Sequence, residues 1–62
     1  MIDIERLRND LIDYFMGLAY VLSPVAFMNV AEVEKADEDK LIEIAINNNF
    51  DLNDYVIKTR GL

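Results

Sequence analysis

Two pairs of carboxylates are the side chains of this chain best spaced for chemistry. Asp10 stands three residues before Asp13, and Asp39 stands four residues before Glu43. Residues at this spacing share one face of a helix, where two carboxyl groups could serve as general acid and general base. That chemistry needs one carboxyl group with a pKa raised by an apolar environment. Both pairs fall among polar residues, so we expect solvated surface groups rather than a catalytic pair.

Other catalytic and ligand-binding patterns are missing from the sequence. It contains no cysteine and no histidine, which excludes disulfides and the usual zinc ligands. Ser23 and Thr59 therefore have no histidine to activate them as nucleophiles. The stretch from Asp37 lacks the glycine and glutamate of a calcium-binding EF-hand loop, and Gly17 and Gly61 form no phosphate-binding loop. We expect no enzyme activity, no metal and no cofactor.

Charge is distributed unevenly along the chain, whose formal net charge is −6. Residues 14–31 carry no charge, whereas residues 32–43 carry six acidic side chains against Lys35 and Lys40. Acidic proteins repel phosphate backbones, so we expect no nucleic-acid partner. The acidic run is interpreted as a solvated face.

The uncharged run of residues 14–31 approaches the length of a membrane span. Gly17, the pair Ser23-Pro24 and Asn29 interrupt it, and acidic rather than basic residues flank it. The first residues also lack the basic segment of a signal peptide. These features predict no membrane association and a cytoplasmic location.

Capping residues and apolar spacing predict a single all-α domain over residues 1–62, a bundle of three to four helices. The predicted helices cover residues 3–22, 24–35, 38–48 and 52–59. The expected N-terminal caps are Asp3, Ser23 followed by Pro24, Asp37 and Asp51, while Asn49 and Gly61 are expected to end helices.

Each predicted helix has an apolar face. The first has two adjacent stripes: Ile4, Leu7, Leu11, Tyr14, Leu18 and Val21, and beside them Ile12, Phe15, Ala19 and Leu22. The second presents Val25 and Met28 on one side, with Phe27, Val30 and Val33 near them. The third is expected to bury Leu41, Ile42, Ala45 and Ile46, with Ile44 at the flank, and the fourth Leu52, Tyr55 and Val56.

Residues 36–56 carry a recognisable local pattern: Ala45, three variable residues, Asn49-Phe50, and then a short segment capped by Asp51. This stretch resembles the second half of the nif-type leader-peptide domain, in which a glycine stands at the position of Asn49. The chain also resembles small uncharacterised helical proteins of Gram-positive bacteria. The resemblance implies a helical fold and, as an alternative function, a leader-like domain read by a peptide-modifying enzyme.

A second alternative is a helix-turn-helix over residues 41–60, with Lys58 and Arg60 at its far end. In that arrangement Asp51 and Asp54 would face DNA phosphates at the start of the recognition helix. A DNA-associated regulator is therefore the weaker alternative.

The first two predicted helices have more apolar surface than a 62-residue monomer is expected to hide. We therefore expect a homodimer, most simply a two-fold one, and a protein–protein interaction module that acts as a homo-oligomer. An apolar groove between helices could also accept a partner helix. The alternative is that the same side chains line only the core of one chain. The face expected to be shared consists of Tyr14, Phe15, Leu18, Tyr20, Val21, Val25 and Met28.

Overall fold

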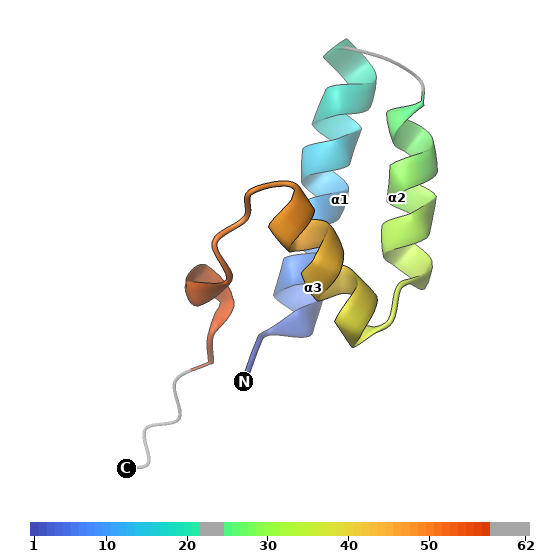
Figure 1. Cartoon of the computed structure of the whole chain (residues 1–62). Coiled ribbons are helices and arrows are strands. Elements are labelled where there is room, and N and C mark those ends of the chain that lie inside the picture. Colours follow the sequence, from blue (N-terminus) through green and yellow to red (C-terminus); the bar gives the residue numbers. More distant parts are fainter. Residues whose placement is uncertain (22–24, 58–62) are drawn as a thin grey trace.

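The computed structural model describes residues 1–21 and 25–57, with all side chains except those of residues 19–21 and 26. These residues form α1 (Ile4–Val21), α2 (Ala26–Lys35), α3 (Glu38–Asn47) and η1 (Leu52–Tyr55), a turn of 3-10 helix. Figure 1 shows α1 and α2 as an antiparallel hairpin, with α3 across its lower half. The N-terminus and the last described residues lie at that same lower end (Figure 1). The predicted all-α domain is confirmed: the described residues form three α-helices and a 3-10 turn, within the predicted range of three to four helices.

Three of the predicted N-terminal caps are confirmed. The Oδ1 atom of Asp3 accepts a hydrogen bond from the backbone N–H of Arg6 at 3.2 Å. Asp37 and Asp51 accept from Lys40 and Asn53 in the same way, each at 2.9 Å. Each carboxylate satisfies a backbone N–H that has no partner within the helix. The predicted cap at Ser23-Pro24 lies outside the described residues.

The ends of α2 and α3 are closed in different ways. Asn49 follows α3 with φ at 65°, the left-handed conformation predicted for it, and Phe50 N–H donates to the Ala45 carbonyl at 2.9 Å. At the end of α2, Arg8 of α1 supplies the cap. Its Nη1 atom donates to the carbonyls of Val33 and Ala36, both at 2.8 Å.

The predicted fourth helix is wrong over the residues that the structure describes. Within residues 52–57, Leu52–Tyr55 form a 3-10 turn and Val56 has an extended backbone. Val56 forms an isolated antiparallel bridge with Ile2, and Ile57 N–H donates to the Met1 carbonyl at 2.7 Å. An α-helix would need that N–H for the carbonyl four residues earlier. Backbone pairing with the N-terminal segment therefore replaces the helix.

The core lies where α1, α3 and η1 meet the end of α2. The buried stripe of α1 takes Leu7 and Leu11 from the first predicted stripe and Phe15 from the second, at intervals of four residues. On α3 the predicted pattern needs correction, because Ile44 is buried and Ile46 is 57% exposed. The buried apolar residues are Leu7, Leu11, Phe15, Val33, Ala36, Leu41, Ile44, Ala45 and Tyr55.

Candidate interaction surface

The upper half of the α1–α2 hairpin projects beyond α3 (Figure 1). After α3, Phe50 contacts α1 through Tyr14, with the two ring centroids 5.4 Å apart. Beyond this level four apolar side chains are well exposed: Met16 at 40%, Val25 at 64%, Phe27 at 51% and Met28 at 72%. We refer to Met16, Val25, Phe27 and Met28 as the apolar tip.

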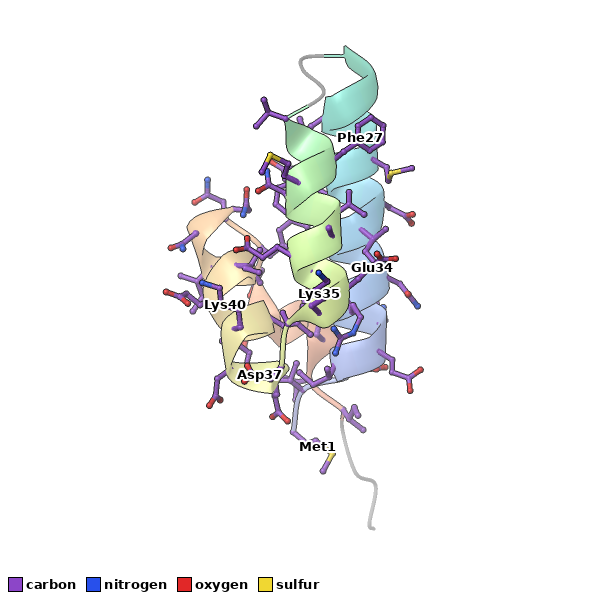
Figure 2. The ribbon with its side chains drawn as sticks, turned by 90° about the vertical axis from the view of Figure 1, so that its right-hand side faces the viewer. Met1, Phe27, Glu34, Lys35, Asp37 and Lys40 are labelled. Atoms are coloured by element: carbon purple, nitrogen blue, oxygen red, sulfur yellow. The ribbon has the colours of Figure 1, made fainter. Side chains whose placement is uncertain are left out.

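The side chains of the apolar tip spread over more than one side of the hairpin. Figure 2 shows Phe27 and Glu34 on the same side of α2, with Lys35 pointing outward from the hairpin. Met28 precedes Lys35 by seven residues, close to two helical turns, so it shares this outward face. The tip is therefore apolar around the beginning of α2, on more than one side of the hairpin.

The acidic run and the apolar tip lie at opposite ends of the described structure, although the base also exposes apolar side chains, namely Met1, Val56 and Ile57. Residues 14–31, which include the whole apolar tip, carry no charged side chain. The acidic run begins at Glu32, in the second half of α2, and continues through the first turns of α3 (Figures 1 and 2). Within it, Lys40 Nζ pairs with Glu43 Oε1 at 3.3 Å. A partner that meets the tip would therefore meet little electrostatic repulsion.

The residues predicted for a shared face divide into three groups. Val25 and Met28 lie on the apolar tip, and Tyr14 lies at its lower rim. Phe15 is only 5% exposed because it continues the buried stripe of Leu7 and Leu11. The other predicted residues are Leu18, which is half-buried against the core, and Tyr20 and Val21, whose side chains lie outside the described part.

Met16 and Phe27 belong to the apolar tip but were not predicted as interface residues. Their helical register carries the signal that could have identified them. Met16 follows Asn9 by seven residues, and Phe27 precedes Glu34 by seven, so each shares a helix side with a polar residue. An apolar side chain aligned with polar ones points away from the core.

A polar cluster at the base joins η1 to α1. The Tyr55 hydroxyl donates a hydrogen bond to Asp10 Oδ2 at 2.6 Å. The Arg6 guanidinium lies 5.0 Å from the centre of the Tyr55 ring, and its Nη1 donates to the Asp54 carbonyl at 3.2 Å. Burial, followed by the hydrogen bond to Asp10, raises the pKa of Tyr55 to about 12. The hydroxyl therefore stays protonated at neutral pH and acts as a structural donor rather than as a base.

The remaining features of the described residues offer no second site. Asp13, Asp39 and Glu43, from the two carboxylate pairs, are exposed, and no three metal-binding side chains converge within residues 1–21 and 25–57. None of the described helices combines the length and the apolar character needed to cross a bilayer. Residues 1–21 and 25–57 also form no pocket. The exposed apolar side chains there project from the surface and do not line a groove.

The helix-turn-helix arrangement lacks its second helix within the described chain. Such a recognition helix needs several turns to fill a major groove, whereas Leu52–Tyr55 make a single 3-10 turn. Lys58 and Arg60 lie outside the described residues. No family model matches the chain, and searches of the curated proteins and of the solved structures found no match.

Proposed function

We propose that this chain is a small protein–protein interaction module that works by self-association through the apolar tip. The observation that carries the proposal is the exposure of four apolar side chains on one uncharged, projecting end. Burying apolar surface contributes about 25 cal/mol per Å² to association, against the cost of lost translational and rotational freedom. The base of the molecule has its own core of buried side chains, beside which Met1, Val56 and Ile57 are exposed.

A second copy suits this surface for reasons of symmetry and charge. A two-fold interface uses the same patch on both subunits, so an apolar patch is automatically complementary to itself. The patch is also the part of an acidic molecule that carries no charge. Two copies can therefore meet there while their acidic residues stay in solvent.

The interface is expected to be small. The eight residues from Tyr14 to Val21 span about 12 Å of helix at 1.5 Å per residue. Contacts of this extent fall at the lower end of specific interfaces, about 1,200 Å² or less in total, where association is transient. The dimer should therefore dissociate on dilution, as expected for a module that exchanges partners.

The test is the double substitution Phe27→Ser and Met28→Ser, followed by sedimentation equilibrium over a range of concentrations. Wild type should show a concentration-dependent shift from monomer to dimer. The double variant should stay monomeric, because two of the most exposed tip side chains lose their apolar surface.

Ile46→Ser is the matched control, since Ile46 is as exposed as the tip residues but belongs to α3. This variant should dimerise like wild type. Wild type that remains monomeric throughout, or equal loss of dimer in both variants, would contradict self-association through the tip.

A further inference from the structure

We infer that the two copies meet head to head, with overlapping tips, antiparallel hairpins and acidic bases at opposite ends of the dimer. This inference rests on the proposed self-association and specifies its geometry. The alternative is a parallel dimer, in which the two hairpins lie side by side and point in the same direction.

The distribution of charge separates the two arrangements. The run from Glu32 to Glu43 holds six acidic residues and two lysines, and it occupies the end of α2 and the beginning of α3. A parallel dimer that buries Phe27 would set Glu34 of one copy beside Glu34 of the other, because Phe27 and Glu34 lie on the same side of α2 (Figure 2). Like charges that face each other across an interface are costly, and two chains of net charge −6 have little basic surface to compensate. The antiparallel arrangement moves the runs apart along the dimer axis.

The position of Phe27 limits where the contact can form. α3 occupies the lower half of one face of the hairpin, and Phe27 lies on the opposite side of α2 from α3 (Figures 1 and 2). A contact that buries Phe27 therefore forms on the side away from α3, where α3 obstructs neither orientation. The distribution of charge is what separates the two arrangements.

The position of the first acidic residue also limits how far the two hairpins can overlap. We expect the overlap to end near the midpoint of α2. Asn29, Val30 and Ala31 separate Met28 from Glu32, so the apolar surface ends within one turn of the first acidic residue. A longer antiparallel overlap would bring Glu32 of one copy onto the apolar tip of the other and bury an unpaired charge.

Electron-electron distance measurements between spin labels test the orientation. The chain has no cysteine, so single substitutions place one label on each copy. Met28→Cys and Lys35→Cys lie seven residues apart on the same outward face of α2. Seven residues of helix span about 10 Å, so for antiparallel hairpins the distance between the two labels should be longer at position 35 than at position 28, by at most about 20 Å.

Ala31→Cys is a third label position, on α2 between the other two, and should give an intermediate distance. It keeps the comparison possible if a label at position 28 weakens the contact. A dimer mass with equal distances at positions 28, 31 and 35 would overturn the antiparallel arrangement and leave the proposed self-association intact. A monomer mass for the unlabelled protein at every concentration would overturn both.

Discussion

Tyr55 connects three parts of the chain that are far apart in sequence. Its ring stacks on Phe50 with centroids 6.4 Å apart, its other contacts are with Arg6 and Asp10 of α1, and its carbonyl accepts from Asp3 N–H at 2.7 Å. The segment after α3 has only one short turn of its own, so these contacts hold it against α1. A single hydroxyl should therefore have a measurable effect on stability.

Tyr55→Phe should lower the free energy of unfolding by about 1.5 kcal/mol, because it removes a hydrogen bond to a charged group and leaves Asp10 without that donor. Urea denaturation monitored by circular dichroism measures this change. Tyr14→Phe is the control, since the Tyr14 ring is partly exposed and its hydroxyl makes no hydrogen bond within residues 1–21 and 25–57. Equal destabilisation by both substitutions would contradict the assigned role of the Asp10 contact.

The same hydroxyl predicts a dependence of stability on pH. Tyr55 has a pKa raised from 10.0 to about 12 in the folded chain, so its contribution is complete below pH 10 and is lost as pH rises toward 12. Wild type and Tyr55→Phe should therefore converge in stability across this interval. A constant difference through pH 12 would mean that the hydroxyl titrates equally in the folded and unfolded chains.

At the scale of the elements, features that depend on neighbours in sequence could be predicted and long-range ones could not. Asp37, Asp51 and Asn49 act on groups within four residues, and the structure confirms all three. The cap that Arg8 provides for α2 joins residues 25 to 28 positions apart, for which the sequence has no local signal. The pairing of Val56 with Ile2 is also long-range, and it replaced the predicted fourth helix.

The core of α3 shows a different limit. Ile42, Ile44, Ala45 and Ile46 place apolar residues nearly all round the helix, so periodicity alone does not decide which side is buried. Packing against α1 buries Leu41, Ile44 and Ala45 and leaves Ile46 exposed. The choice depends on how α3 crosses the hairpin, which is a property of the assembled chain.

Gly17 is the weak point of α1 by helix propensity. It lies in the interior of the helix, and a Cβ atom added there would meet nothing within 4 Å. Gly17→Ala should therefore stabilise the monomer by about 0.8 kcal/mol, because alanine loses less backbone entropy on folding. Thermal or urea unfolding at concentrations below the dimer transition measures the change.

Ala31→Gly provides the opposite control, since Ala31 is an exposed interior residue of α2 and should lose a similar amount. Destabilisation by Gly17→Ala in the monomer would contradict the open space around Gly17. Stabilisation of the monomer together with a weaker dimer would instead show that a partner approaches this side of α1 closely.

At the scale of the whole molecule, the separation of an uncharged end from an acidic one follows directly from the sequence, whereas the membership of the apolar tip does not. The uncharged run of residues 14–31 includes Phe15, which is buried, as well as Phe27 and Met28, which are exposed. The helical register of each side chain and the position of α3 along the hairpin together decide between these outcomes. The shared face stays a prediction; of its residues, Phe15 lies in the core, and Val25 and Met28 are exposed.

The head-to-head dimer makes a prediction about salt that concerns the charge of the complete assembly. Glu32, the acidic residue nearest the tip, lies four residues, or about 6 Å of helix, beyond Met28 in each copy. The two acidic runs are then separated by about 12 Å or more, beyond the screening length of about 10 Å at 0.1 M salt.

The dimer dissociation constant should change by less than about tenfold, or 1.4 kcal/mol, between about 0.05 and 0.5 M salt. Sedimentation equilibrium at both salt concentrations measures it, and Glu38→Gln, which removes a charge at the base, should leave the constant unchanged. A dissociation constant that falls strongly as salt is added, and that also falls in Glu38→Gln at low salt, would contradict the head-to-head arrangement. That result would mean that the acidic runs face each other across the interface.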